Sequence, residues 1–341
     1  MRRFRFLRNP LATEIGSSEE AFLQILGGPS CIFLDGEDSR RTRAFVTLLH
    51  GNEPSGTRAL FHWLKSGRRP AVNVVCIVAS VTAARQAPLF SHRMLPGARD
   101  LNRCFRPPFV DEQGRLAEEI LEILHMHHPE AVIDMHNTSG SGPAFGVCTH
   151  MDRQHDALVS IFTNRLIVSN LALGALMDIS EHTYPTVTVE VGGRLDELAQ
   201  RVATAGLARY LTQEHVLALE HVEHALELLL DPIRLELNPG VSLTYAGSAA
   251  PDADITLLPD IERHNFGTVN SELALGWARG EARRLFTARD AGGRCAVARL
   301  VRIEEGVLYP AQELKLFMVT SNPDIAQTDC LFYAVTSAAA P

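Results

Sequence analysis

Two apolar runs that each lead to a histidine constrain this chain more than any other feature. The first covers residues 45–49 and is followed by His50 and, three positions later, Glu53. The second covers residues 131–135 and is followed by His136. Short apolar runs of this kind are typical of buried strands. In open α/β folds the carboxyl ends of such strands meet at a crevice, where polar side chains can gather.

His50, Glu53 and His136 together offer two imidazole nitrogens and one carboxylate. This is the ligand set of a catalytic Zn²⁺, which takes three protein ligands and leaves a further position open. An HxxE quartet by itself is a weak signal, because chance produces it often. The placement of both histidines just past apolar runs favours a metal site over surface groups. We therefore predict one Zn²⁺ per chain, bound by these three residues.

Asp134 lies two residues before His136, so on a strand the two side chains point to the same face. A carboxylate in that place can accept the second N–H of a metal-bound imidazole and fix the orientation of the ring. On position alone, an aspartate that caps a local turn is an equal alternative.

Strand and helix patterns alternate over roughly the first two thirds of the chain. Alternation of this kind indicates an α/β sheet flanked by helices. The main predicted elements of this part are strands over 31–34, 44–49, 71–79 and 185–193, and helices over 114–128, 152–166 and about 195–230.

The pattern changes near Asp231-Pro232, where short strands separated by turn residues replace the alternation. We therefore predict two domains, a zinc-hydrolase catalytic domain over 1–230 and a smaller, mainly β domain over 231–341. The predicted strands of the second domain are 233–237, 242–245, 296–303, 314–319 and 331–335.

Composition and charge exclude several classes of function. The 341 residues carry a formal net charge of −8 at pH 7, which argues against a basic nucleic-acid surface. No run approaches the roughly 18 apolar residues of a membrane span, and the N-terminus lacks the apolar segment of a signal peptide. The six cysteines are scattered without CxxC pairs, as expected of reduced thiols. We expect a cytoplasmic protein without nucleic-acid or membrane partners, and the oligomeric state, including a homo-oligomer, stays open.

Four short motifs stand in order along the first 200 residues. They are HGNE at 50–53, DLNR at 100–103, DMHNT at 134–138 and VEVG at 189–192. With these motifs the chain resembles the succinylglutamate desuccinylase/aspartoacylase family, relatives of the zinc carboxypeptidases. The resemblance implies a zinc carboxypeptidase-like α/β fold with a mixed central sheet and a smaller second domain. It also implies a zinc-dependent deacylase that cleaves the amide bond of a small N-acyl amino acid.

The resemblance carries roles over to the matching positions. Glu190 would be the general base and later the general acid, moving a proton from water to the leaving amine. Asn102 and Arg103 would bind the substrate carboxylate, since a guanidinium fork suits that planar anion. Asn137 would contact the substrate.

An arginine upstream of the DLNR motif would polarise the scissile carbonyl and stabilise the oxyanion. Arg93 is the candidate for this role. Because the spacing from Arg93 to Asn102 is longer than in the family, Arg99 is the alternative.

One departure from the family concerns substrate choice. Aspartoacylases carry a further arginine shortly before the catalytic Glu, and the corresponding region here, 177–183, contains none. Specificity for N-acetylaspartate is therefore not predicted. His182 or Tyr184 is a candidate for serving a different substrate.

Two other groups of histidines are not assigned to zinc. One stands at a predicted helix end, where histidine favours the helix dipole and solvent, and the other is spread along a helix. The first group is His125, His127 and His128, and the second is His215, His221 and His224.

Two alternatives to the deacylase remain. A carboxypeptidase would share the zinc ligands and the base but accept peptides. A binding protein that has lost catalysis would need a missing ligand or base, and none is missing here.

Overall fold

The computed structural model describes residues 3–138, 140–169, 173–181, 183–218, 226–328 and 330–336. The chain forms two compact units. The first unit contains residues 1–137 and 144–228, and the second contains residues 138–143 and 229–341. The six-residue segment 138–143, which directly follows the predicted zinc strand, is thus part of the second unit. The strand patterns of the sequence gave no indication of this insertion.

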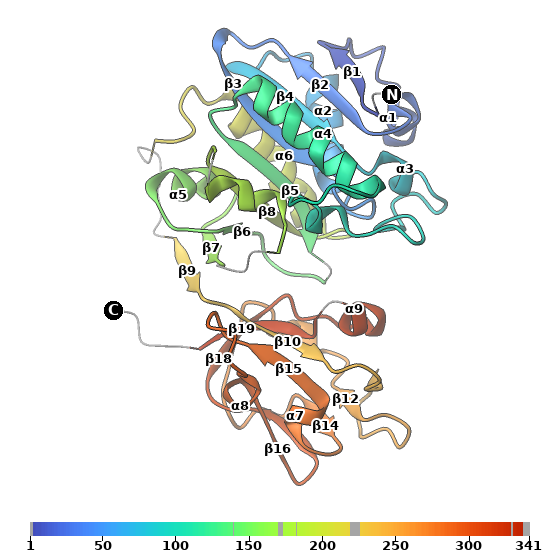
Figure 1. The fold of residues 1–341 in the computed structure, drawn as a ribbon, viewed down its shortest axis with the longest axis vertical. Coiled ribbons are helices and arrows are strands. Elements are labelled where there is room, and N and C mark those ends of the chain that lie inside the picture. Colours follow the sequence, from blue (N-terminus) through green and yellow to red (C-terminus); the bar gives the residue numbers. More distant parts are fainter. Residues whose placement is uncertain are drawn as a thin grey trace. The chain divides into compact units, whose positions relative to one another are not determined.

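The first unit is built on a nine-stranded sheet of order β1-β2-β4-β3-β5-β8-β6-β7-β9 (Figure 1). β2 runs antiparallel to β4, and β6 runs antiparallel to β8, whereas β3 is parallel to both β4 and β5. The predicted mixed sheet is therefore confirmed. The strands are β1 (Arg5–Arg8), β2 (Ser30–Leu34), β3 (Asp38–Thr47), β4 (Val72–Val78), β5 (Val132–Thr138), β6 (Phe145–Cys148), β7 (Arg165–Val168), β8 (Thr186–Gly193) and β9 (Glu227–Leu230).

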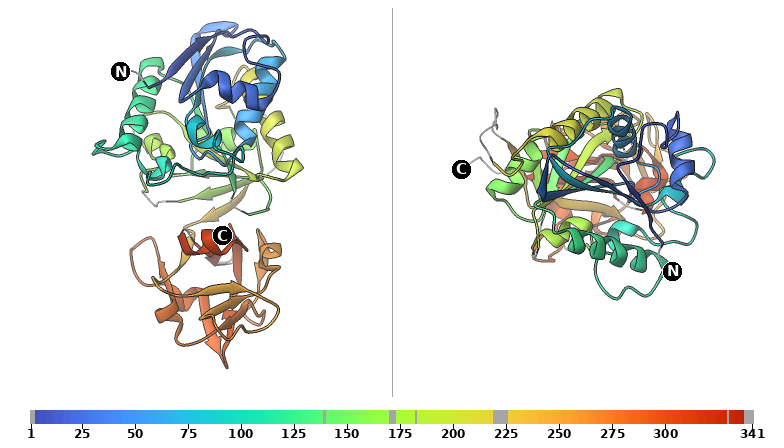
Figure 2. Two further views of the ribbon diagram at one scale, coloured as in Figure 1. Left: turned by 90° about the vertical axis from the view of Figure 1, so that its right-hand side faces the viewer. Right: turned by 90° about the horizontal axis from the view of Figure 1, so that it is seen from above.

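Helices cover both faces of this sheet, because successive residues of a buried strand point to opposite sides. Phe45 packs into the core that includes α1, α2 and α6, whereas its neighbours Ala44 and Val46 pack into the core that includes α4. Figure 2 shows these helices on the two sides of the sheet. The helices are α1 (Glu19–Leu26), α2 (Ser55–Lys65), α3 (Val81–Ala84), α4 (Glu112–His127), α5 (Arg153–Ser160) and α6 (Glu197–Thr212), with 3₁₀ turns η1 (Leu101–Arg103) and η2 (Leu176–Glu181).

Two predicted helices of the first unit are too long. The helix predicted over 152–166 ends at Ser160, because the Thr163 hydroxyl bonds the Ala144 carbonyl and the next residues join the sheet as β7. The helical zone predicted over 195–230 contains α6, but its last residues form the edge strand β9 beside β7. Leucine has a high helix propensity, which sheet pairing overrides here. His221 and His224 lie outside the described residues.

The second unit consists of two five-stranded sheets, of order β13-β18-β19-β10-β15 and β11-β12-β14-β17-β16, around a common apolar core. The strand predicted over 296–303 is partly wrong, because its first half is a helical turn that buries Val297 and Leu300. The elements are β10 (Ile233–Leu237), β11 (Leu243–Tyr245), β12 (Ile255–Leu257), η4 (Ile261–His264), β13 (Thr268–Val269), β14 (Gly276–Ala278), α7 (Ala282–Leu285), β15 (Phe286–Arg289), α8 (Val297–Leu300), β16 (Val301–Glu304), β17 (Val307–Pro310), β18 (Leu314–Phe317), α9 (Pro323–Thr328) and β19 (Phe332–Thr336).

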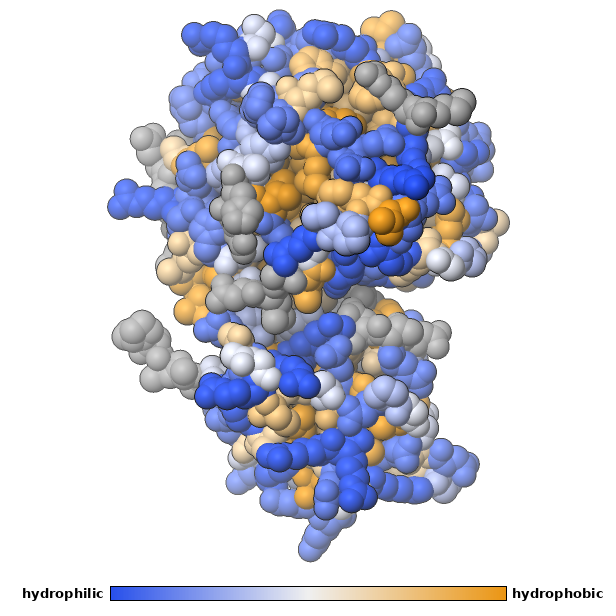
Figure 3. Space-filling model, in the orientation of Figure 1, coloured by the Kyte–Doolittle hydropathy of each residue, from blue (hydrophilic) through white to orange (hydrophobic). Residues whose placement is uncertain are grey.

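The surface of each unit is mainly hydrophilic on the face drawn in Figure 3, with smaller groups of apolar residues between the polar ones. Across the described ranges, no helix is both long and apolar enough to cross a bilayer.

Candidate metal centre and active site

The predicted zinc ligands come from the ends of two neighbouring parallel strands. β3 and β5 pair in register, with Thr47 opposite Met135, so their carboxyl ends lie at the same edge of the sheet. After β3 the chain turns at Leu48, whose φ of +59° is in the left-handed region. His50 and Glu53 follow this turn, and α2 begins directly afterwards. His136 stands one residue beyond Met135 on β5 itself.

The three side chains form one buried cluster. His50 Nδ1 lies 2.8 Å from Glu53 Oε1, and His136 Nδ1 lies 2.7 Å from Glu53 Oε2. His50, Glu53 and His136 are only 4%, 6% and 2% exposed, respectively. One ligand atom from each lies within 4.8 Å of the others. The structure thus brings together the three residues that the sequence predicted as a set.

The outer nitrogen of each histidine is held by an aspartate. His50 Nε2 lies 2.8 Å from Asp100 Oδ1, and His136 Nε2 lies 2.8 Å from Asp134 Oδ2. Both rings therefore turn Nδ1 toward Glu53. Asp134 makes the contact that the alternation of β5 predicted. Asp100, the first residue of the DLNR motif, was missed as a partner of His50. No sequence pattern links a loop residue to a histidine 50 positions earlier.

The donor set fits a zinc ion. Bonds of about 2.0–2.1 Å in a tetrahedron put neighbouring ligand atoms about 3.3 Å apart, close to the 2.7 and 2.8 Å between Glu53 and the two imidazoles. Burial opposes ionisation of Glu53, but His50 and His136 hold the pKa of its carboxyl well below the usual range. The carboxylate is therefore ionised, as a metal ligand must be.

Glu190 presents a different environment. It lies on β8, which neighbours β5 in the sheet. Its Oε2 is buried and has no hydrogen-bond partner within the described part of the chain. The pKa of this carboxyl is raised to about 7, mainly by burial; the nearby His136 lowers it and Glu53 raises it. A half-buried acid with one buried, unpartnered oxygen and a pKa near neutrality has the properties of a general base.

Of the two arginine candidates, only Arg93 reaches the cluster. Its Nη1 donates to Glu53 Oε1 at 3.2 Å and its Nη2 donates to Asp100 Oδ2 at 2.9 Å. Arg99 instead pairs with Asp111, with Nη2 to Oδ1 at 2.9 Å, and its side chain is 50% exposed.

The loop that carries Arg93 is tied to the HGNE segment. The Gly51 N–H donates to the Arg93 carbonyl at 2.8 Å. A Cβ at Gly51 would lie 2.6 Å from the His92 carbonyl oxygen and 2.7 Å from Ala83 Cβ, closer than side chains approach. Glycine at this position therefore permits the close passage of the two segments.

Asn102 and Arg103 of the DLNR motif form hydrogen bonds with backbone groups of their surroundings. The buried Asn102 accepts from the Leu176 N–H at Oδ1, at 2.9 Å, and its own N–H donates to Asp100 at 2.8 Å. Arg103 is half-buried, and its Nη1 donates to the Asn102 carbonyl at 2.8 Å. The predicted carboxylate-binding role of Asn102 and Arg103 stays a prediction.

Asn137 has a full set of partners within the scaffold. Its Oδ1 accepts from the Ser55 N–H at 3.0 Å, and its Nδ2 donates to Ser55 Oγ at 2.9 Å and to the Gly192 carbonyl at 2.8 Å. Its backbone N–H donates to Glu53 Oε2 at 3.3 Å. The side chain thus links β5, β8 and the start of α2. The structure gives Asn137 this positioning role, while its contact with substrate remains a prediction.

The region without the family's second arginine is occupied by η2. Asp178 is buried there and accepts from the Gly174 N–H at 2.8 Å, and Arg106 Nη2 lies 3.5 Å from its Oδ2. Tyr184 is half-buried, and burial raises the pKa of its hydroxyl. His182 lies outside the described residues.

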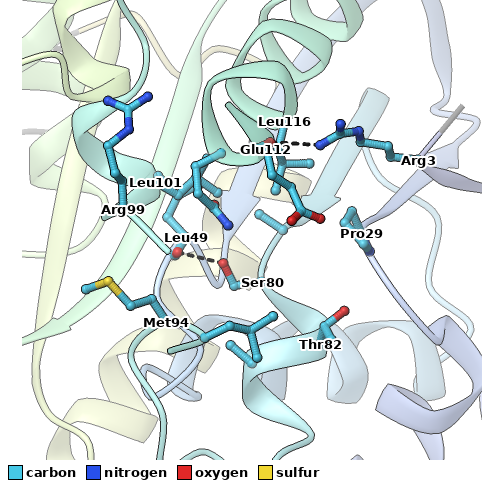
Figure 4. Close-up of a pocket in the computed structure, with 14 residues that line it drawn as sticks. Arg3, Pro29, Leu49, Ser80, Thr82, Met94, Arg99, Leu101, Glu112 and Leu116 are labelled. Atoms are coloured by element: carbon cyan, nitrogen blue, oxygen red, sulfur yellow. Dashed lines mark hydrogen bonds between the residues drawn. The ribbon is translucent and has the colours of Figure 1, made fainter. Parts of the chain in front are cut away.

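A cavity of about 550 Å³ lies elsewhere in the first unit (Figure 4). It lies between the end of β3, α3 and the start of α4. Ser80 Oγ donates to the Leu49 carbonyl across one wall, and Arg3 Nη1 donates to the Glu112 carbonyl across another. Leu49 precedes His50, but the predicted zinc ligands do not line the cavity, so we assign it no part in the reaction.

The chain is thus an α/β protein whose mixed sheet carries a His–Glu–His candidate metal centre at its strand ends, with the half-buried Glu190 on the neighbouring strand. The family model described as the succinylglutamate desuccinylase/aspartoacylase catalytic domain matches residues 43–213, half of the chain. The chain belongs to this family of deacylases, which are hydrolases. The matched stretch contains all four motifs and the whole cluster.

Solved structures show that the fold is shared with other proteins. A succinylglutamate desuccinylase/aspartoacylase from Rhodobacter sphaeroides has a TM-score of 0.56 at 14% identity, over 89% of this chain and 87% of that one. The succinylglutamate desuccinylase from Chromobacterium violaceum has a TM-score of 0.54 at 12% identity, over 91% and 89%. A point mutant of murine aminoacylase 3 has a TM-score of 0.53 at 16% identity, over 86% and 94%. No curated protein sequence matches the chain.

Proposed function

We propose that this chain is a zinc-dependent amidohydrolase that removes the acyl group from a small N-acyl amino acid or a related amide. The contrast between two carboxylates carries the proposal. Each oxygen of Glu53 lies close to Nδ1 of one histidine, so the three side chains can share one ion. Glu190 instead keeps a buried oxygen without a partner in the described chain. Membership of a deacylase family supports the proposal that the bond cleaved joins an acyl group to an amine.

In this proposal His50, Glu53 and His136 hold one Zn²⁺ per chain, which supplies a Lewis acid able to make water acidic enough to attack near neutral pH. Glu190 accepts a proton from the attacking water at Oε2. The water oxygen bonds to the amide carbonyl carbon, and the C–N bond then breaks. Glu190 delivers the proton to the departing nitrogen, so that the products are a carboxylic acid and a free amine.

Arg93 donates to the carbonyl oxygen as negative charge develops on it. The hydrogen bonds of Arg93 to Glu53 and Asp100 keep its guanidinium at the cluster and support this role. Asn102 and Arg103 bind the substrate carboxylate. Asp134 and Asp100 orient the histidines, since an imidazole whose outer N–H is fixed presents its other nitrogen to the metal.

The assignment of catalysis to residues 1–230 and of a smaller, mainly β domain to 231–341 is part of the proposal. So is a cytoplasmic location, which is supported by the absence of disulfide bonds among the cysteines of the described residues.

A substrate screen tests the proposed function. Zinc-loaded protein is offered N-acetyl, N-succinyl and N-formyl amino acids alongside dipeptides with a free C-terminus, and release of the amine is measured. Hydrolysis of N-acyl amino acids, lost in Glu190→Gln, supports the proposal. Hydrolysis confined to peptides would identify a carboxypeptidase. Binding without hydrolysis of either class would favour a non-catalytic protein.

A further inference from the structure

A second His–carboxylate–His cluster lies at the start of α5, in the first unit (Figure 1). Asp152 is the N-cap of this helix, and its Oδ1 accepts from the Gln154 and His155 N–H groups at 2.8 and 2.9 Å. His155 stands one turn later on the helix, and His150 precedes the cap. This H-x-D-x-x-H pattern was not singled out in the sequence.

Both imidazoles face the same carboxylate. His155 Nδ1 lies 2.8 Å from Asp152 Oδ1, and His150 Nε2 lies 3.2 Å from Asp152 Oδ2. The two rings are 4.4 Å apart between centroids, at 66°. One ligand atom from each of the three residues lies within 4.8 Å of the others.

The arrangement reproduces that of the predicted zinc centre. There, too, each oxygen of one carboxylate meets one imidazole, at 2.8 and 2.7 Å, and the rings of His50 and His136 are 5.1 Å apart at 61°. Across the described residues, these are the two groups of metal-ligating side chains that come close enough to share an ion. Tetrahedral zinc requires about 3.3 Å between neighbouring ligand atoms, which both clusters approach.

The second cluster is remote from the first along the sheet. β6 runs antiparallel to β8, with Phe145 opposite Glu190 and Val147 opposite Thr188. The chain therefore moves away from Glu190 as it proceeds along β6 to His150. The Cys148 thiol, which donates to the His150 carbonyl at 3.1 Å, fixes the turn that follows the strand.

We propose that His150, Asp152 and His155 bind a second divalent transition-metal ion, with Zn²⁺ as the ion that best suits two imidazoles and one carboxylate. His155 is buried, with 2% of its side chain exposed, whereas the side chains of His150 and Asp152 are 45% and 39% exposed. The ion would thus rest on a fixed inner ligand and remain open to water on its outer side. Such a site exchanges metal with solvent and braces the start of α5.

Metal stoichiometry tests this site independently of catalysis. The full chain is stripped with a chelator, equilibrated with Zn²⁺, and its bound metal is counted by elemental analysis. We expect two zinc ions per chain in the wild type and one in Asp152→Asn. Asparagine caps helices as well as aspartate does, so this variant should keep α5 while losing the charged ligand. His150→Ala, at a half-exposed position, should also bind one ion.

His125→Ala is the matched control. The His125 and His128 rings form a similar pair, 5.1 Å apart at 63°, but they belong to no ligand group among the described residues, so this variant should still bind two ions. Glu53→Gln should bind one ion, and Glu53→Gln/Asp152→Asn none. An Asp152→Asn protein that binds as many zinc ions as the wild type overturns the second site. A Glu53→Gln protein that keeps two contradicts the first centre only.

Discussion

The two His–carboxylate–His clusters share their ligand chemistry but differ in what surrounds them. At the first, both outer nitrogens are held by aspartates at 2.8 Å, and Arg93 contacts the central carboxylate. A further acid, the half-buried Glu190, lies on the next strand. At the second, His150 Nδ1 lies 3.0 Å from the hydroxyl of Thr149, and two of the three ligands are substantially exposed.

This difference separates metal binding from catalysis. Three ligands suffice to hold an ion, but hydrolysis also requires a base, an electrophilic donor and a dry environment that strengthens both. In the proposed reaction, Glu190 is the base, Arg93 is the donor, and the burial of the first cluster supplies the dry environment.

Removal of the base should have the largest effect. Glu190→Gln should lower turnover of the best N-acyl amino acid by about a thousandfold or more, since the substitution removes proton transfer in both steps. Its zinc content should equal that of the wild type. Asp152→Asn, measured in the same assay, should change turnover by less than about twofold. A Glu190→Gln enzyme with near-normal turnover would remove this residue as the base.

Removal of the electrophilic donor should come next. Arg93→Ala should reduce kcat by about 10²-fold, as expected for loss of one donor to the developing oxyanion. Arg99→Ala is the matched control, because Arg99 pairs with Asp111 away from the cluster, and it should stay close to wild type. If Arg99→Ala lost kcat and Arg93→Ala stayed close to wild type, Arg99 would be the residue that polarises the carbonyl.

Loss of an orienting aspartate should weaken metal binding. Asp134→Asn should lower zinc affinity at the first cluster about 10–100-fold, the usual cost of removing the partner of a metal-bound histidine. Competition with a chromophoric chelator measures this affinity. Thr149→Val, which removes the neighbour of His150 Nδ1 at the second cluster, should change affinity there by much less. An unchanged affinity in Asp134→Asn would show that the contact between Asp134 and His136 does not affect metal binding.

The raised pKa of Glu190 should appear in the stability of the metal-free chain. Its folded pKa of about 7 exceeds the ordinary 4.5, so the folded state binds this proton more tightly than the unfolded state. The resulting stabilisation of the folded chain is fully present below about pH 4.5 and is lost as the pH rises through 7. Glutamine does not titrate. Metal-free Glu190→Gln should therefore gain unfolding free energy relative to wild type as the pH rises between these values, by about 3 kcal/mol in total. Urea unfolding at several pH values measures the difference, and a constant difference would contradict the shift.

The sequence predicted the parts of this site that follow from local periodicity. His50 and His136 were found because each terminates an apolar run, and Asp134 because side chains alternate along a strand. Asp100 was missed as the partner of His50 because this pairing joins a loop to a strand end through the fold. The strand β9 was missed because its leucines have a high helix propensity, and only pairing with β7 in the folded sheet makes this segment a strand. The second cluster was missed because no strand pattern marks it.

The most direct test of the zinc amidohydrolase is a zinc titration of chelator-stripped Asp152→Asn protein, with hydrolysis of an N-acyl amino acid as the readout. This variant should keep only the first cluster, so the rate should rise from near zero and reach a plateau at one zinc per chain. A stripped protein that hydrolyses its substrate at the full rate, unchanged by added zinc, would contradict the account.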